Sequence, residues 1–321
     1  MSEKPRVWLE RPALPDLGPE LDAAATILGP GTSDNPIAGI ATAEGALAGV
    51  LAYDASLMDQ APQLRVICRT GIGVDKVDIP EATRRGIAVC NTPDGPTIST
   101  AEHAFGLILT AAKNMKRSSG WLSEGQHDMF ARHHAIELDG KTLGLVGFGR
   151  IPRRVAAAAH GIGMRVRAYD PHLAPTAFAG AEPAETLEDL LATSDVISVH
   201  VPLTADTAGL FDADRFASMR DGVVFVNTAR GGVVNQEALV AALDSGKILA
   251  AGLDVTDPEP LPSDHTLLHR DNVIVTPHVA SGTWEGKRRM FRKAFEQAIQ
   301  VLSGELPDHL VNPEVWDRLS Q

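Results

Sequence analysis

The strongest constraint on the fold is a series of short, largely apolar segments that recurs through the second half of the chain. They are TLGLVGF (142–148), RVRAYD (165–170), DVISVHV (195–201), GVVFVNTA (222–229), LAAGLDV (249–255) and NVIVTPH (272–278). A near-continuous apolar run of this length is typical of a strand that helices cover on both faces. Segments long enough for helices separate most of the runs. The pattern therefore predicts an α/β unit with a parallel sheet.

The first hundred residues show the same alternation, in the apolar runs RVWL, AATIL, GVLAY, LRVICR and IAVCN. They predict a second parallel α/β unit. A chain of 321 residues is also too long for one ordinary core, because domains usually contain roughly 100–200 residues. We therefore expect an α/β protein with two Rossmann-like domains.

The composition excludes several classes of partner. The formal net charge of −12 argues against binding to nucleic acid, which needs clustered cations. The most basic segment, GKRRMFRK (286–293), has a helical pattern and is interpreted as the solvated face of a helix. No run of about 18 apolar residues occurs, so we predict no membrane span.

The cysteines and the N-terminus favour a cytoplasmic location. Cys68 and Cys90 each lie in a short apolar run, without a Cys-x-x-Cys pattern or a histidine at ligand spacing, so neither a disulfide nor a metal site is expected. The segment MSEKPRVWLE is charged and has no apolar signal core.

A glycine turn follows the first of the six apolar segments. The residues are Gly147, Phe148, Gly149, Arg150 and Ile151, and an Ala-rich helical segment comes next. A turn of this type between a strand and a helix lets the backbone approach a pyrophosphate at the helix N-terminus. Pro152 replaces the third glycine of the usual pattern. Proline is tolerated in a first helical turn, but the helix is expected to stand slightly farther from the strand.

Asp170 ends the next strand, 23 residues after Gly147. An acidic side chain at this place bonds the ribose hydroxyls of a dinucleotide and repels a 2′-phosphate. The adjacent DPHL segment offers no arginine that would neutralise such a phosphate. The sequence therefore favours NAD over NADP.

Three further residues have the chemistry needed for hydride transfer on a 2-keto or 2-hydroxy acid. Arg230 follows a strand end in NTARGG, Glu259 lies in DPEPLP, and His278 follows a strand end in TPHVASGT. Arginine binds a substrate carboxylate or keto oxygen through its planar fork. Histidine transfers a proton near neutral pH, and an adjacent carboxylate orients it and favours its charged form.

The order and spacing of these three residues, together with the glycine turn, resemble the D-isomer-specific 2-hydroxyacid dehydrogenases. The resemblance extends from about residue 64 to residue 304. It implies that Arg230 binds the substrate, that His278 is the acid/base and that Glu259 orients it.

The resemblance also implies further binding residues. For the cofactor they are the glycine turn, Asp170, and the strand-end residues His200, Val201, Pro202, Thr204, Thr228, Ala229, Asp254 and Ser281. Asp254 would meet the nicotinamide carboxamide, or serve only as a turn or N-cap residue. For the substrate they are Tyr53, Arg69, Gly73 and Val74, in addition to Arg230 and His278. His103 is interpreted as a packing or interface residue.

In this family the nucleotide domain is inserted into a discontinuous substrate domain. The resemblance thus implies a flavodoxin-like substrate domain over 1–99 and 287–321, and an NAD-binding Rossmann domain over 100–286. The apolar helical segment at 97–117 is implied to lie in the contact of a homodimer. Residues 118–140 are expected to form a loop and a short helix.

The substrate stays open at this point. GIGVDKVDIPEATRRGIAVCNTPDGPTISTAEH resembles the phosphoglycerate dehydrogenases, whereas GGVVNQEAL and AGLDVTDPEPLP resemble the glyoxylate/hydroxypyruvate reductases. Tyr53 stands where a phosphoglycerate dehydrogenase can present a basic residue, which disfavours a phosphorylated substrate. An NAD(H)-responsive corepressor that keeps the three residues is an alternative of a different class.

Overall fold

Two sheets form the framework, and every pairing between their strands is parallel. The computed structural model describes residues 3–126, 130 and 133–319. The chain divides into two compact units, Met1–Thr97 with Gly282–Gln321 (unit 1), and Ile98–Ser281 (unit 2). The predicted two-domain α/β architecture with parallel sheets is confirmed. The assignment of unit 1 to substrate binding stays a prediction.

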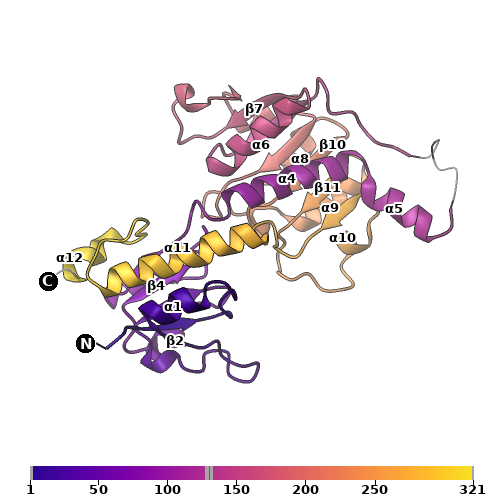
Figure 1. The fold of residues 1–321 in the computed structure, drawn as a ribbon. Helices are drawn as coiled ribbons and strands as arrows, with labels where there is room; N and C mark the ends of the chain where they lie inside the picture. Colours follow the sequence, from indigo (N-terminus) through magenta and orange to yellow (C-terminus); the bar gives the residue numbers. More distant parts are fainter. Residues whose placement is uncertain (1–2, 127–129, 131–132, 320–321) are drawn as a thin grey trace. The chain divides into compact units, whose positions relative to one another are not determined.

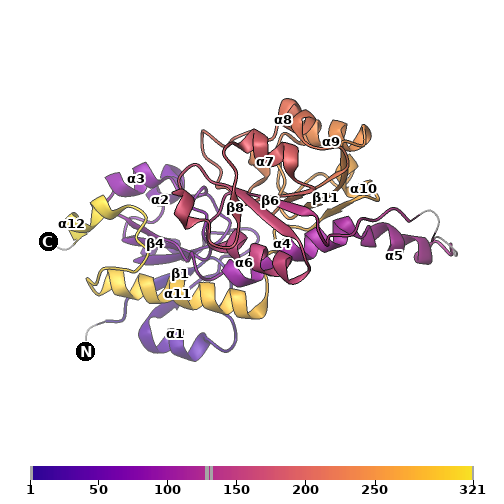
Figure 2. The same cartoon turned by 90° about the horizontal axis from the view of Figure 1, so that it is seen from above.

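Unit 1 contains a sheet in the order β2-β1-β3-β4-β5, which is the flavodoxin-like order. Helices α1 and α11 cover one face of this sheet and α2 and α3 the other (Figure 2). Its elements are β1 (Arg6–Leu9), α1 (Gly18–Ala24), β2 (Thr26–Leu28), β3 (Gly45–Ala48), α2 (Ala55–Asp59), β4 (Val66–Arg69), α3 (Ile79–Arg84), β5 (Ala88–Cys90), α11 (Trp284–Leu302) and α12 (Trp316–Leu319), with 3-10 turns at Ile40–Thr42 and Pro313–Val315.

The edge strand β5 is covered by the C-terminal part of the chain. Val311 donates its backbone N–H to Val89 O at 2.7 Å. The buried side chain of Asn312 accepts from Val89 N at 2.8 Å and donates to Ile87 O at 3.0 Å and to Thr83 Oγ1 at 2.9 Å. An uncovered edge would present unpaired backbone groups, so this segment completes the sheet.

Unit 2 contains a sheet in the order β12-β11-β10-β9-β6-β7-β8, which is the doubly wound order. Its elements are α4 (Thr97–Ala112), α5 (Met115–Ser123), β6 (Thr142–Val146), α6 (Arg150–Gly161), β7 (Arg165–Tyr169), β8 (Glu182–Pro183), α7 (Leu187–Thr193), β9 (Val196–Val199), α8 (Ala213–Ser218), β10 (Val223–Asn227), α9 (Gln236–Asp244), β11 (Ile248–Leu253), α10 (Thr266–His269) and β12 (Val273–Val275), with 3-10 turns at Pro175–Ala177 and Gly231–Val233.

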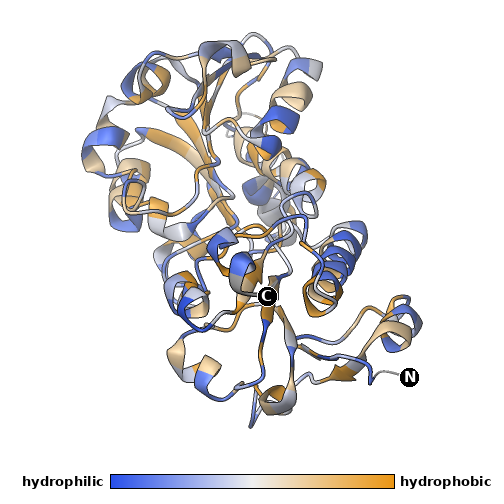
Figure 3. Cartoon of the chain, turned by 90° about the vertical axis from the view of Figure 1, so that its left-hand side faces the viewer, coloured by the Kyte–Doolittle hydropathy of each residue, from blue (hydrophilic) through white to orange (hydrophobic). Residues whose placement is uncertain are grey.

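Helices cover both faces of the unit 2 sheet, as the apolar runs predict. One core lies between the sheet and α7, α8 and α9, and includes a cluster of Phe211, Phe216 and Phe225. The other lies between the sheet and α4 and α6 (Figure 1). Figure 3 shows that the strands are mostly hydrophobic and that the helices contain both hydrophilic and hydrophobic residues.

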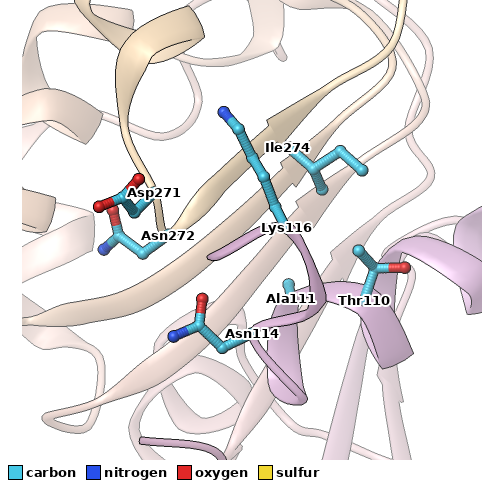
Figure 4. A pocket seen from close by; sticks show the side chains of 7 residues that line it. All are labelled: Thr110, Ala111, Asn114, Lys116, Asp271, Asn272 and Ile274. Carbon is cyan, nitrogen blue, oxygen red and sulfur yellow. The ribbon is translucent and has the colours of Figure 1, made fainter. Parts of the chain in front are cut away.

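Helix α5 is attached to the edge of the sheet by Lys116 and by Arg117, which forms an ion pair with Asp271 at 2.7 Å. Lys116 Nζ donates to the carbonyl oxygens of Leu268, Arg270 and Val273, at 3.1, 2.8 and 2.7 Å. Partial burial lowers the pKa of Lys116. Lys116 also borders a small cavity beside Asn272 and Ile274 (Figure 4). The cavity lies at the start of β12, at the edge of the sheet opposite the strand ends where ligands of such folds bind.

The remaining predictions about organisation have mixed outcomes. The expected short helix within 118–140 is the end of α5, and residues 127–129 and 131–132 of this stretch lie outside the described residues. The basic segment 286–293 lies on α11, where Arg288, Arg292 and Lys293 form ion pairs with Asp16, Glu20 and Asp308. No helix in the described part of the chain has the length and hydropathy of a membrane span.

Replacing Asn312 by Ala is expected to lower the free energy of unfolding of unit 1 by about 2–4 kcal/mol, because buried backbone groups of β5 lose their partners. Urea unfolding, together with hydrogen exchange at Val89, measures the effect. Asn35→Ala is the control: Asn35 is exposed, and its replacement should cost less than about 0.5 kcal/mol. Equal stability of the two variants would contradict the role given to Asn312.

Candidate active site

The carboxyl ends of six strands of unit 2 lie in one row. Val146 of β6 is in register with Tyr169 of β7 and Val199 of β9, and the row continues through Asn227 and Leu253 to Val275. Ligands of open parallel sheets bind beyond such ends, at the point where the strand order reverses, which here lies between β6 and β9. Most of the residues predicted from the sequence for unit 2 follow this row within a few positions.

The glycine turn lies at the reversal point. Gly147 has φ of +90°, and a Cβ atom there would lie 2.9 Å from His200 O, so only glycine fits. A Cβ atom on Gly149 would have no neighbour within 4 Å, which leaves open space in front of the N-terminus of α6. Pro152 is buried in the first turn of α6, where a missing N–H costs no helical hydrogen bond.

Asp170 holds the glycine turn. Its Oδ2 accepts from Phe148 N at 2.9 Å, and its Oδ1 accepts from His172 N at 3.0 Å. The Phe148 ring is fully buried and stacks on Phe178, with ring centroids 5.3 Å apart. Phe148 was predicted to contact the cofactor, but its ring belongs to the core, so only its backbone faces the turn.

The segment after β9 joins the other side of the turn. His200 N donates to Val146 O at 2.8 Å, and His200 Nε2 lies 2.9 Å from Ser198 Oγ. Burial lowers the pKa of His200 to about 3, so the ring is neutral at physiological pH. Val201 is partly buried and Pro202 and Thr204 are exposed, and Thr207 Oγ1 closes this turn by bonding Pro202 O and Thr204 N.

Beyond β10, Asn227 shapes the turn that carries Arg230. Its side chain accepts from Ala229 N and donates to Arg230 O, both at 2.9 Å. The half-buried Arg230 donates to Ala229 O at 2.6 Å. Gly231 is required next to it, because a Cβ atom there would lie 2.0 Å from the backbone of Thr256. The turn that carries Arg230 therefore packs against the loop that follows β11, at the same edge of the sheet.

The hydroxyl of Thr228 is buried and has no hydrogen-bond partner among the described residues. Thr228 follows the last residue of β10 at the row of strand ends. A buried polar atom usually has a partner, so an orphan at this edge points to a ligand that would supply one.

His278 and Glu259 form the closest ion pair of the site. His278 Nδ1 lies 2.6 Å from Glu259 Oε1, and both side chains are accessible, at 44% and 37% exposure. His278 has φ of +52°, which is rare for residues other than glycine. Its backbone N–H is held by Asp254 O and Thr276 O, at 2.8 and 3.0 Å. Strained backbone of this kind is common at functional sites.

Asp254 anchors the loop that carries His278. Its carboxylate is 1% exposed and accepts from Thr276 Oγ1 at 2.6 Å and from the N–H groups of Val279 and Ala280, both at 2.9 Å. His103 Nε2 lies 3.0 Å from Thr276 Oγ1 and 3.4 Å from Asp254 Oδ1. Despite its burial, these hydrogen bonds lower the pKa of Asp254. Asp254 therefore holds a turn of the backbone, which is one of the two roles considered for it from the sequence.

The loop that carries Glu259 is held by Gln236. The Gln236 side chain donates to Asp257 O and accepts from Asp257 N at 3.2 Å. The amide thus binds both backbone groups of one residue, two positions before Glu259. Thr256 Oγ1 donates to Pro258 O at 3.0 Å within the same loop.

The substrate residues predicted in unit 1 lie at the carboxyl ends of its own strands. Tyr53 is fully buried and pairs with Val77 in a parallel bridge. Arg69 donates to Gly73 O and Ala48 O, both at 3.0 Å, and so braces the turn that contains Gly73 and Val74. Gly73 and Val74 are partly buried. The burial of Tyr53 means that its ring supports the loop rather than facing solvent.

The site of unit 2 fits a dinucleotide cofactor. The open space at Gly149 suits a pyrophosphate, the carboxylate of Asp170 suits a ribose, and the orphan hydroxyl of Thr228 lies along the same edge. Ser281 is partly buried after the His278 loop. Arg230 and the His278–Glu259 pair lie along the same edge of the sheet; a guanidinium is a group that suits a carboxylate, and a paired imidazole is a group that suits proton transfer.

Several residues that shape the site were not predicted. From the sequence, His103 is expected to be a packing or interface residue. No role is expected for the Asn227 side chain or for Thr276, and Gln236 enters only through the family resemblance. The sequence does contain one indication for Asn227, because it is the polar residue that ends the apolar run VVFVN. For His103 and Thr276, which lie 173 positions apart, no local pattern marks the contact.

Comparison with known proteins agrees with this geometry. Residues 105–280 match the family model described as D-isomer specific 2-hydroxyacid dehydrogenase, NAD binding domain. A D-3-phosphoglycerate dehydrogenase of Archaeoglobus fulgidus is 43% identical over 258 residues, which cover 78% of this chain and 48% of that protein. A glyoxylate reductase of Thermofilum pendens is 42% identical over 268 residues, covering 82% and 79%.

The chain thus spans about half the length of the phosphoglycerate dehydrogenases that it matches. Among solved structures, a D-lactate dehydrogenase from Aquifex aeolicus complexed with NAD and lactic acid has a TM-score of 0.84 and 30% identity. The match covers 96% of this chain and 99% of that one. With its glycine turn, its strand-end row and these similarities, the chain belongs to the D-isomer specific 2-hydroxyacid dehydrogenase family.

Proposed function

We propose that the protein is an NAD-dependent D-2-hydroxyacid dehydrogenase that interconverts a small 2-keto acid and its 2-hydroxy acid. The observation that carries this proposal is the pairing of His278 with Glu259 at 2.6 Å, on the same sheet edge as Arg230 and the glycine turn. A histidine that a carboxylate orients can donate and accept a proton, which the interconversion of a keto acid and a hydroxy acid requires.

Each residue then has a distinct role. Arg230 binds the substrate carboxylate or keto oxygen as a bidentate donor. Because Glu259 binds Nδ1, the Nε2 atom of His278 is the one that gives a proton to the keto oxygen, or removes the hydroxyl proton in the reverse direction. The nicotinamide cofactor, when bound, supplies or accepts the hydride. Asp254, Thr276 and His103 position the His278 loop.

The preference for NAD follows from Asp170. Its carboxylate lies at the end of β7, where the ribose of a dinucleotide is held, and it would repel a 2′-phosphate. For the substrate we favour glyoxylate or hydroxypyruvate. 3-Phosphoglycerate is the alternative, because phosphoglycerate dehydrogenases are also among the relatives.

An absorbance assay of NADH oxidation tests the proposal. Purified protein is mixed with glyoxylate, hydroxypyruvate, pyruvate, phenylpyruvate or 3-phosphohydroxypyruvate, with NADH and separately with NADPH. We expect turnover of glyoxylate or hydroxypyruvate, and faster turnover with NADH than with NADPH. Binding of NADH without turnover of any acid would refute the enzymatic proposal and favour an NAD(H)-responsive binding protein.

His278→Ala is expected to lower kcat by about 10²–10⁴-fold, because the reaction loses its general acid/base. Glu259→Gln keeps a hydrogen-bond acceptor but removes the charge, and should lower kcat less. NADH binding, followed by fluorescence, should persist in both variants. His160→Ala is the control, because His160 is an exposed residue at the end of α6. Near-normal turnover by the His278 variant would remove it as the acid/base.

We also propose that the protein is a cytoplasmic homodimer that associates through α4 and α5. Helix α4 is largely apolar, and α5 exposes Met115 and Leu122 at 48% and 70%. Apolar side chains exposed together are typical of a protein interface. The two cysteines are free and buried, which fits a reducing compartment.

Light scattering after size exclusion should give a mass of twice 34.1 kDa for the protein. Leu122→Asp should shift this mass toward the monomer, since a charge in an apolar interface is costly. Leu306→Asp, at a residue 60% exposed in unit 1, should leave it unchanged. A monomeric unmodified protein would contradict the proposed dimer.

A further inference from the structure

Glu259 lies on an exposed stretch of the loop that follows β11. The buried part of this loop ends at Thr256, and residues 257–260 are all exposed. Pro258 and Pro260 have no backbone N–H, so Asp257 and Glu259 carry the only backbone donors of the stretch. Packing contributes little to the position of such a stretch. The 2.6 Å contact of Glu259 with His278 therefore depends on the few hydrogen bonds that the stretch makes.

The side chain of Gln236 ties this stretch to the N-terminus of α9. Its Oε1 atom accepts from Asp257 N at 3.2 Å, and its Nε2 atom donates to Asp257 O. An amide side chain has one acceptor and one donor group, and here both are used on the same residue. Two bonds to one residue fix its orientation as well as its position. Glu259 is only two positions further along the chain.

The backbone that carries Gln236 is itself firmly held. Gln236 is the first residue of α9, and the segment before it is bonded to the fully buried Phe211. Phe211 N donates to Val233 O, and Asn235 N donates to Phe211 O, both at 3.0 Å. The Phe211 ring belongs to the aromatic cluster of the core. The Gln236 side chain therefore starts from a fixed point.

The same connection between β10 and α9 carries Arg230, at its other end. Gly231, the next residue, packs so closely against the backbone of Thr256 that a Cβ atom would lie 2.0 Å from it. The connection thus meets the loop after β11 at two places, through Gly231 at Thr256 and through Gln236 at Asp257. Two contacts from one segment fix the direction of this loop relative to Arg230.

We propose that Gln236 is a positioning residue that keeps Glu259 against His278 by holding the backbone of Asp257. The inference rests on the proposed function, in which Glu259 orients His278 for proton transfer. Because the stretch is exposed, water replaces the two hydrogen bonds when the side chain is removed, and the fold loses little stability. The reaction loses more, because a small displacement of a reacting group lowers the rate.

A double-mutant cycle separates this role from a purely structural one. Gln236→Met keeps the length of the side chain and removes both hydrogen bonds. We expect kcat for the acid that is turned over fastest to fall by about 3- to 10-fold, with the melting temperature and NADH binding nearly unchanged. Glu259→Ala lacks the group that Gln236 positions. In this background, Gln236→Met should change kcat by less than about 2-fold.

Asn235→Ala is the matched control. Asn235 caps the same helix by accepting from Ala238 N at 3.0 Å, so its loss weakens the start of α9 without releasing Asp257. The kcat of this variant should stay close to that of the unmodified protein. An equal loss of kcat from Gln236→Met in both backgrounds would overturn the role through Glu259, as would an unchanged kcat in the single variant.

Hydrogen exchange gives a second readout that does not depend on turnover. The Asp257 N–H should exchange faster in Gln236→Met than in Asn235→Ala, because only the first variant loses its acceptor. If the unmodified protein turned over no acid, the proposed function would fail, whereas exchange at Asp257 would still show whether Gln236 holds this loop. Equal exchange rates in the two variants would overturn the inference.

Discussion

The register of the parallel strands in unit 2 is the constraint on which the rest of the site depends. The last residues of five strands lie in one row, and they are Val146, Val199, Asn227, Leu253 and Val275. The loops that follow these strands therefore begin at the same edge of the sheet. A shift of one strand by one residue would turn its apolar side chains away from their core. The packing of both faces therefore fixes the register, and the register brings together residues that lie far apart in the sequence.

Buried polar side chains convert this common edge into a defined site. Asp254 binds the His278 loop through two backbone N–H groups and Thr276, and Asn227 binds the Arg230 turn in a similar way. A buried polar group without a hydrogen-bond partner raises the free energy of the folded state. Loop conformations that break these hydrogen bonds are therefore disfavoured. The left-handed backbone of His278 is held by these contacts.

Both units have backbone N–H donors at the reversal point of their sheet, but the surroundings of these donors differ. In unit 2 the N-terminus of α6 and the open space at Gly149 leave backbone donors accessible at the reversal point of the sheet. In unit 1 the corresponding donors, the N–H groups of Gly49, Val50 and Leu51, are bound by Glu10. The backbone donors at the reversal point of unit 1 are therefore occupied by a side chain of the protein itself.

The fold class, the parallel sheets and the chemical identity of the candidate residues can all be read from local sequence patterns. Apolar runs bounded by turns are local signals, and so are the glycine turn and the acidic residue 23 positions after it. Arg230, Glu259 and His278 were also identified by local motifs, although only the folded chain gives the 2.6 Å pair.

Which of these side chains face the site and which support it depends on how the strands and helices pack in three dimensions. The Phe148 ring and the Tyr53 side chain proved to be buried, and Asp254 proved to be a buried anchor. The contacts of His103 with Thr276 and of Glu10 with the loop after β3 join residues from separate elements. Such contacts depend on where the packed strands and helices bring each loop, and no spacing along the chain encodes that position.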